Sequence, residues 1–329
     1  MTSWLPTTFL LALTSAIVLV DSRYVGDLTI YAKDAEAARL QMHEAILRNQ
    51  PPSEGWAGVG ANGLNVRIAT IYLSEGFSRV TGLPVLKVYK LIDMASLLAA
   101  LLCLERFLAR WGTLPTRMIA ILFVGMILPM TYAFHYFHPW DRLGWLAWII
   151  CLWALANDRF GLLVVGLAAG MLIKYDVIVV ALLYPMVWFD RHDERRRIAL
   201  RTVALLILCF GVYFGLRWLL PGGFTPRDYG LHISRNVDTL LTLNVGHPLV
   251  LGFGLPTVLA IVGWRDADRF ARSAAVIAVP LLALFFLQTN FNEIRAQMGA
   301  LTLLMPAATC GLQRLLARGA PYDCRPKLH

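Results

Sequence analysis

The 329-residue sequence has few charges: 16% of its residues are Asp, Glu, Lys or Arg, whereas 58% are hydrophobic. Soluble domains carry about a quarter charged residues, so this chain has too little polar surface to enclose a water-soluble globule of its length. The net charge is +9. The sequence nevertheless lacks a basic stripe interleaved with aromatic residues on a polar domain, which argues against nucleic acid as a partner.

Paired cysteines are lacking too. None of the five cysteines forms a Cys-x-x-Cys pair, so the sequence predicts neither a zinc site nor a disulfide framework. The His-x-x-x-His and Glu-x-x-His spacings that place two ligands on one helix face do not occur. No cofactor is therefore predicted. Binding of a divalent cation stays an open alternative, but the sequence predicts no ligands for it. Repeats, low-complexity segments and linkers are also missing, which favours one membrane domain over residues 1–329.

Long apolar runs, by contrast, are abundant. A helix needs about 20 residues to cross the hydrocarbon core of a bilayer, and ten runs approach this length. They cover residues 4–20, 88–108, 118–134, 143–156, 160–173, 177–189, 202–220, 249–264, 273–288 and 297–316. The first run has no preceding basic residue, so we expect a retained anchor rather than a cleaved signal. The predicted fold is an all-α, polytopic transmembrane helical bundle of about ten spans.

The orientation follows from the positions of Lys and Arg, which collect in cytoplasmic loops. With a cytoplasmic N-terminus, more than half of the 30 basic residues fall in cytoplasmic segments. The prediction is a multi-pass protein of a bacterial inner membrane with both termini in the cytoplasm. Between residues 160 and 189, a single helix would move the Arg191–Arg201 cluster outside. Two short helices that meet at Lys174-Tyr175-Asp176 on the outer side agree with the orientation.

The longest polar segment, residues 21–87, is then a periplasmic loop. Residues 34–49 and 64–79 have helical patterns that end at Pro51-Pro52 and at Thr81-Gly82, and we expect both helices to lie on the bilayer surface. Residues 58–63 match Gly-x-Gly-x-x-Gly, but no strand precedes them, so they are interpreted as a turn. The spacings Gly166-x-x-x-Gly170 and Gly211-x-x-x-Gly215 indicate close helix packing.

Reactive side chains gather in the outer connections, and we treat seven as candidate substrate-binding residues. They are His138, Asp141, Lys174, Asp176, Arg235, Glu293 and Arg295. Each has a structural alternative: His138 as an aromatic-belt residue, Asp141 as the local partner of Arg142, and Arg295 as the partner of Glu293. Lys174 and Asp176 are the strongest candidates, because ionisable groups near membrane depth are costly and usually functional.

Group transfer outside the cytoplasm needs a donor that crossed the bilayer on a lipid, a carboxylate base and cations for the donor phosphate. The arrangement resembles the polytopic GT-C glycosyltransferases. The resemblance rests on a first span that ends at Val20-Asp21-Ser22-Arg23-Tyr24, a long first outer loop with surface helices, the Thr81-Gly82-Leu83-Pro84 turn and short paired helices. It covers most of the chain as an architecture, without one specific motif.

This resemblance implies transfer of a sugar from a polyprenyl-phosphate donor to a glycan, lipid or protein acceptor. It assigns the catalytic base to Asp21, with Asp27 and Asp34 as competitors. It assigns the grip on the lipid phosphate to Arg295, or else to Lys174 or Arg235. A polytopic transporter or flippase, a polysaccharide polymerase or ligase of envelope glycan assembly, and a non-catalytic assembly subunit are the alternatives.

Overall fold

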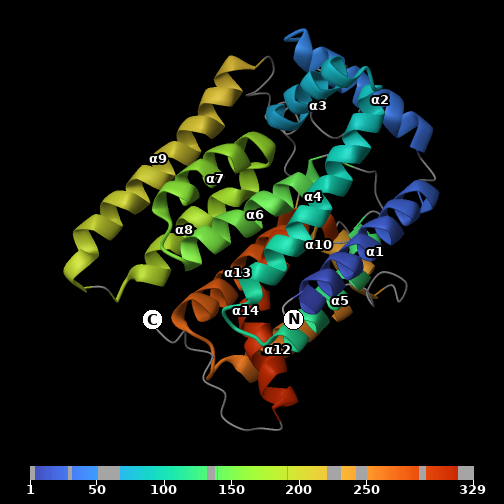
Figure 1. Cartoon of the computed structure of the whole chain (residues 1–329). Helices are drawn as coiled ribbons and strands as arrows, with labels where there is room; N and C mark the ends of the chain where they lie inside the picture. Colours follow the sequence, from blue (N-terminus) through green and yellow to red (C-terminus); the bar gives the residue numbers. More distant parts are fainter. Residues whose placement is uncertain are drawn as a thin grey trace. The chain divides into compact units, whose positions relative to one another are not determined.

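The computed structural model describes residues 4–28, 32–50, 67–131, 138, 140–190, 192–220, 231–241, 250–288 and 294–317. All regular elements within these residues are helices (Figure 1), so the predicted all-α class is confirmed. The chain divides into two compact units, and the division falls within α4 (Val85–Leu108). Each unit is described separately below.

Unit 1 contains residues 1–29, 98–135 and 230–329. It is organised around α14 (Ile294–Leu316), whose side chains are buried along almost the whole helix. α14 packs against α12 (Leu255–Gly263) and α13 (Arg269–Gln288). The unit also contains α1 (Trp4–Leu28), the second half of α4, α5 (Leu114–Ile127), a 3-10 turn (Leu128–Thr131), α10 (Ile233–Leu241) and a π-helical turn (Val250–Gly254).

α12 and α14 cross with their backbones in contact at Gly263 and Gly311. A Cβ atom on Gly311 would lie 2.8 Å from the carbonyl carbon of Leu259, and one on Gly263 would lie 2.9 Å from the Cα of Gly311. Both distances are below those that real Cβ atoms adopt. The crossing therefore depends on the absence of a side chain at both positions.

Arginine–aspartate pairs join connections that are far apart in sequence at one end of unit 1. Arg110 Nε donates to Asp268 Oδ2 at 2.9 Å, which links the α4–α5 connection to the α12–α13 connection. Arg314, near the end of α14, lies 3.4 Å from Asp266 of the same connection. The sequence prediction assigned these three segments to one side of a membrane, and the structure brings them to one end of the unit.

Unit 2 contains residues 30–97 and 136–229. Its helices are α2 (Ala32–Leu47), α3 (Ile68–Thr81), the first half of α4, α6 (Asp141–Ala156), α7 (Phe160–Ile173), α8 (Ile178–Trp188) and α9 (Arg195–Leu219), with 3-10 turns at Tyr175–Val177 and His192–Glu194. The Phe160 ring at the start of α7 lies 5.8 Å from the Tyr184 ring late in α8. The chain therefore reverses between α7 and α8, and the prediction of two short helices is confirmed.

The two predicted glycine pairs differ in their surroundings. A Cβ on Gly166 would lie 2.9 Å from the Cys151 sulfur, and one on Gly170 would lie 3.4 Å from the Ala147 Cβ, so this pair packs α7 against α6 as expected. For Gly211 and Gly215 on α9, no described atom lies within 4 Å of the added Cβ. The packing interpretation is therefore wrong for the second pair within the described part of the chain.

The ends of α3 and α1 relate differently to the sequence pattern. α3 ends as expected, because Gly82 adopts a left-handed φ of 71° and its N–H bonds to the Ser78 carbonyl, a geometry that glycine adopts without strain. The first predicted span covers residues 4–20, and α1 continues beyond it to Leu28. Residues 21–28 include no proline, so the helix can continue beyond its apolar run. Asp21 therefore lies within α1 rather than after it.

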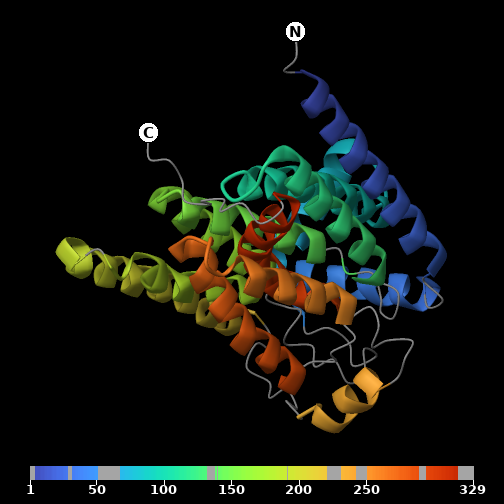
Figure 2. The same ribbon diagram turned by 90° about the horizontal axis from the view of Figure 1, so that it is seen from below.

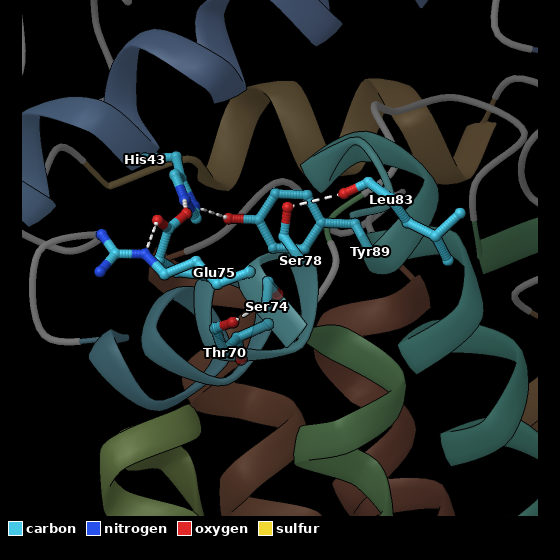
Figure 3. A network of polar contacts seen from close by, with 8 residues as sticks. His43, Thr70, Ser74, Glu75, Ser78, Leu83 and Tyr89 are labelled. Atoms are coloured by element: carbon cyan, nitrogen blue, oxygen red, sulfur yellow. Dashed lines mark hydrogen bonds and ion pairs between the residues drawn. The ribbon is translucent and has the colours of Figure 1, made fainter. Parts of the chain in front are cut away.

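A buried histidine connects the three helices α2, α3 and α4 (Figure 3). His43 of α2 is 2% exposed; its Nδ1 lies 2.6 Å from the Tyr89 hydroxyl of α4 and its Nε2 lies 3.1 Å from Glu75 Oε2 of α3. Glu75 also accepts a hydrogen bond from Arg79 Nε at 2.6 Å. The hydrogen bonds from His43 and then from Arg79 hold the pKa of Glu75 below its ordinary value, so the carboxylate is ionised at neutral pH. An ionised Glu75 can only accept, so His43 donates to it from Nε2.

Replacing this histidine should loosen α2. His43→Ala should lower the free energy of unfolding by about 2–4 kcal/mol, since it removes a buried ring and leaves the buried Tyr89 hydroxyl without this bond. Tyr89→Phe should cost about 1 kcal/mol, and a double-mutant cycle should reveal a coupling of at least about 0.5 kcal/mol. Arg48→Ala on the same helix is the control, because its pair with Glu44 is exposed and should contribute little. Thermal unfolding of the four variants measures these values, and equal effects of His43→Ala and Arg48→Ala would contradict the assignment.

Among the described residues, two helices, α9 and α13, are long and apolar enough to cross a membrane. Much of their apolar surface faces outward: Ile207 and Trp218 on α9 are 68% and 83% exposed, and Val279 on α13 is 64% exposed. A soluble protein seldom exposes such a continuous apolar surface. Five further apolar helical segments in the described part of the chain are shorter, between 10 and 17 residues. The described part of each of the ten predicted spans is helical, which confirms the secondary structure of these segments.

Candidate functional site

The Lys174 ammonium lies between two carboxylates in unit 2. Its Nζ atom is 3.4 Å from Asp141 Oδ1 and 3.5 Å from Asp176 Oδ2. The three side chains are 14%, 6% and 16% exposed, so the group is largely shielded from solvent. Trp148 Nε1 of α6 donates to Asp176 Oδ1 at 3.2 Å. We call Asp141, Lys174 and Asp176 the Lys174 cluster.

Local structure explains how these residues meet. α7 ends at Ile173, and Lys174 adopts an extended backbone conformation before the 3-10 turn that carries Asp176. Asp141 is the first residue of α6, a position that favours a negative charge. Gly144 lies one turn later, and a Cβ there would be 3.3 Å from the Lys174 Cβ. Glycine at this position therefore allows the lysine stem to lie directly against α6.

Aromatic rings border the Lys174 cluster. The Arg67 guanidinium, at the start of α3, lies 4.9 Å from the ring centroid of Trp140, and the His138 ring lies 5.0 Å from the same tryptophan. Trp140 itself is fully buried. Arg67 is close enough for its positive charge to repel the Lys174 ammonium. Two cations are therefore held near the two carboxylates. Such stacking on an aromatic face favours a partly desolvated guanidinium.

A second aromatic group connects the cluster to the C-terminal part of α9. The Tyr175 ring, next to both Lys174 and Asp176, lies 5.6 Å from the Tyr213 ring of α9. The guanidinium of Arg217, which is 8% exposed, lies 4.4 Å from the Tyr213 centroid. The Lys174 cluster is therefore close to the end of a helix of membrane-spanning length.

The N-terminal part of α9 has different chemistry. Arg201 lies 3.7 Å from Asp158, donates to the Tyr184 hydroxyl at 3.1 Å, and stacks 4.5 Å over the Phe160 ring. Arg195, Arg196 and Arg197 precede it on the same helix. The 25 residues of α9 correspond to about 37 Å at 1.5 Å per residue. Unit 2 thus has an arginine-rich end and, at the other end of α9, a mixed-charge cluster.

The other predicted site residues lie elsewhere. Asp21 is buried in α1 of unit 1, at 2% exposure. Asp27 and Asp34 lie on the backbones of α1 and α2, but their side chains are outside the described residues. Of the seven substrate-binding candidates, the structure brings together Asp141, Lys174 and Asp176, with His138 against neighbouring Trp140.

The remaining three candidates belong to unit 1. Arg235 is exposed on α10, and Arg295 is partly exposed at the second residue of α14. Glu293 is outside the described residues, and so the predicted pair between Glu293 and Arg295 stays a prediction. Within the described part of the chain, no group of three or more His, Cys, Asp or Glu side chains is arranged to hold a metal ion.

Sequence reasoning missed four residues that shape the cluster: Arg67, Gly144, Trp148 and Tyr213. Arg67 is an isolated arginine inside the predicted helical pattern of residues 64–79, and the other three lie inside apolar runs. Only the spacing of four residues between Gly144 and Trp148, on the α6 face that carries Asp141, was a usable signal. Comparisons with protein-family models, curated proteins and solved structures found no match.

Proposed function

We propose that the protein is a multi-pass membrane glycosyltransferase that moves a sugar from a polyprenyl-phosphate donor to an acceptor at the outer face of the membrane. The observation that carries this proposal is the Lys174 ammonium between Asp141 and Asp176, close to the C-terminal part of α9. Shielded ionisable groups near the end of an apolar helix are costly to bury, so a protein usually retains them for a function.

The outer location is supported by the two ends of unit 2. The exposed apolar surface of α9 fits a helix that contacts lipid, and arginines concentrate at its N-terminal end. Under the positive-inside rule that end belongs in the cytoplasm, which assigns the Lys174 cluster to the outer side. The arginine pairs at one end of unit 1 fit the same rule. The proposed protein has about ten spans in a bacterial inner membrane, with both termini in the cytoplasm.

The chemistry of the cluster suits a phosphate-linked donor. In the proposed reaction, the acceptor hydroxyl oxygen bonds to the anomeric carbon while the bond from that carbon to the donor phosphate breaks. The proton of the hydroxyl passes to a carboxylate, and the polyprenyl phosphate leaves as an anion. Lys174 and Arg67 are the proposed cations for that anion. Arg67 Nε is buried and has no hydrogen-bond partner among the described residues, so an incoming phosphate oxygen would provide one.

The resemblance to GT-C glycosyltransferases supports the same donor and assigns the proton acceptor to Asp21, with Asp27 and Asp34 as competitors. Asp141 enters as a further candidate for this role, because it lies in the cluster that holds the donor in this proposal. The proposed acceptor is a glycan, a lipid or a protein.

A transporter or flippase is the second candidate. Transporters often contain short helices broken at the binding site, and the break between α7 and α8 at Lys174 has this form. Such a protein would bind the same polyprenyl-phosphate sugar but leave its glycosidic bond to phosphate intact. Release of free polyprenyl phosphate in the presence of acceptor extracts distinguishes the two functions.

Donor binding provides the test of the proposed site. Purified protein is mixed with polyprenyl phosphates that carry different hexoses or pentoses, and thermal unfolding is recorded. At a donor concentration about 100-fold above Kd, the free energy of unfolding should rise by about 2.7 kcal/mol. With Lys174→Gln, an affinity weakened about 100-fold should reduce this gain to about 0.4 kcal/mol. Lys174→Arg keeps the charge and should fold even if the glutamine variant does not, yet it should bind less well because its fork has a different geometry.

Arg201→Gln is the matched control, since Arg201 is also a partly buried, paired cation on the same unit. Its removal should lower the unfolding temperature without donor, while the donor-dependent gain stays as in the wild type. A full donor-dependent gain in Lys174→Gln would contradict the site. Absence of a gain with every donor in the wild type would contradict the function.

A further inference from the structure

Helix α10 in unit 1 combines an exposed apolar row with a charged side. Ile233, Val237, Leu240 and Leu241 are all exposed, and their spacing of i, i+4, i+7 and i+8 places them on one stripe of the helix. Arg235 and Asp238 lie on the opposite side and are exposed as well. An amphipathic helix normally turns its apolar stripe toward the protein core, and α10 does not.

The contacts of α10 fix its position at the end of α13, as Figure 2 shows. The His232 N–H donates to the Leu287 carbonyl at 3.0 Å, and Asn236 Nδ2 donates to the Phe286 carbonyl at 2.6 Å. These carbonyls belong to the last turn of α13, which has no intrahelical donors for them. Asn236 is fully buried, so this side of α10, and not its apolar row, faces the protein.

The length of α13 indicates how deep α10 would lie in a bilayer. Its 20 residues correspond to about 30 Å, which matches the hydrocarbon thickness of a bilayer. Val276, Val279, Leu284 and Leu287 on α13 are exposed apolar residues, and this surface runs toward the end where α10 is attached. If α13 crosses the bilayer, a helix bound to its last turn lies where the acyl chains meet the headgroups.

We propose that α10 is an interfacial helix, with Ile233, Val237, Leu240 and Leu241 inserted among lipid acyl chains at the C-terminal end of α13. The inference rests on the membrane location in the proposed function and does not depend on sugar transfer. Lipid is the occupant that the geometry favours, because the exposed apolar row belongs to a helix attached to the last turn of α13, whose length matches the hydrocarbon thickness of a bilayer. Arg235 and Asp238 then lie in the headgroup and water layer, as in other interfacial helices.

Site-specific spin labels test this inference in full-length protein reconstituted into phosphatidylcholine–phosphatidylglycerol nanodiscs. The five native cysteines are replaced by alanine, and single cysteines are introduced as Val237→Cys, Leu240→Cys, Asp238→Cys and, as a reference on α13, Val279→Cys. Molecular oxygen concentrates in the acyl chains, whereas a nickel chelate stays in water. We expect labels at 237, 240 and 279 to be relaxed mainly by oxygen and the label at 238 mainly by the nickel chelate.

The outcomes separate this inference from the proposal on which it rests. Nickel access at both 237 and 238, with oxygen access at 279, would overturn the interfacial position of α10 and leave the membrane protein intact. Protection of the labels at 237 and 240 from both reagents would show that protein covers α10. This result would also overturn the interfacial position of α10. Nickel access at 279 would mean that α13 does not cross the bilayer, so the inference and the proposed membrane location would fail together.

Discussion

Gly311→Ala should lower the free energy of unfolding by about 3 kcal/mol or more and sharply reduce the yield of monodisperse protein. The added methyl group meets helix backbone, the Leu259 carbonyl group and the Gly263 nitrogen, and neither can rotate away as a side chain could. Alanine gains about 1 kcal/mol over glycine in helix propensity, so the clash must exceed this gain. Gly263→Ala should have a similar effect, and because both residues form one crossing, the double variant should cost less than the sum.

Two glycines in open surroundings are the controls for this prediction. Gly76 in α3 and Gly211 in α9 have no described atom within 4 Å of an added Cβ, so alanine at either position should be neutral or stabilise by up to about 1 kcal/mol. Thermal unfolding in detergent, followed by intrinsic fluorescence, measures the four single variants and the double variant. If Gly311→Ala unfolds at the same temperature as Gly76→Ala, the close crossing of α12 and α14 is incorrect.

Asp21→Asn should reduce sugar transfer by about 10²–10⁴-fold, the usual contribution of a positioned proton acceptor. The amide is almost the same size as the carboxylate, so the buried position in α1 should accept it without loss of the fold. Donor-dependent thermal stabilisation should persist, because Lys174 and Arg67, the proposed cations for the donor phosphate, are unchanged in this variant. A fall in turnover with intact donor binding separates a catalytic role from a structural one.

The competing carboxylates are tested in the same way, as Asp27→Asn, Asp34→Asn and Asp141→Asn. Near-normal turnover in Asp21→Asn together with loss in one of these variants would transfer the role of base to that residue. Asp141→Asn is expected to differ from Asp21→Asn in one respect. It removes a partner of Lys174, so it should change donor binding as well as turnover.

Much of the helical pattern is predictable because it depends on local signals. Apolar runs and the Gly82 stop at the end of α3 are properties of adjacent residues, and they predicted helices that the structure contains. The break at Lys174 was also predictable, since three polar residues interrupt an apolar stretch that is too long for one span. The end of α1 was not predictable in this way, because an apolar run that ends at Val20 sets no limit on the helix itself.

The candidate site was predictable only in part. Lys174 and Asp176 stand out because charges are rare in apolar segments, and Asp141 because it precedes one. Their neighbours are set by packing between helices, and no pattern along the chain indicates that Gly144 leaves room for Lys174 or that Trp148 bonds to Asp176. The crossing at Gly263 and Gly311 was missed for the same reason: the two glycines are on different helices, and a spacing search examines one helix at a time.

The central claim, a multi-spanning membrane protein with its site on the outer side, is tested most directly by topology reporters. Fusions of a reporter after Trp56, Pro139 and Gly230 should be active only outside the cytoplasm, and fusions after Arg195 and Lys327 only inside it. Arg195 is the decisive position, because it begins the helix whose C-terminal part contacts Tyr175 beside the Lys174 cluster. The account predicts an internal signal at Arg195 and an external one at Gly230. An external signal at Arg195 would reverse α9 and place the Lys174 cluster in the cytoplasm, which would contradict the proposed outer site.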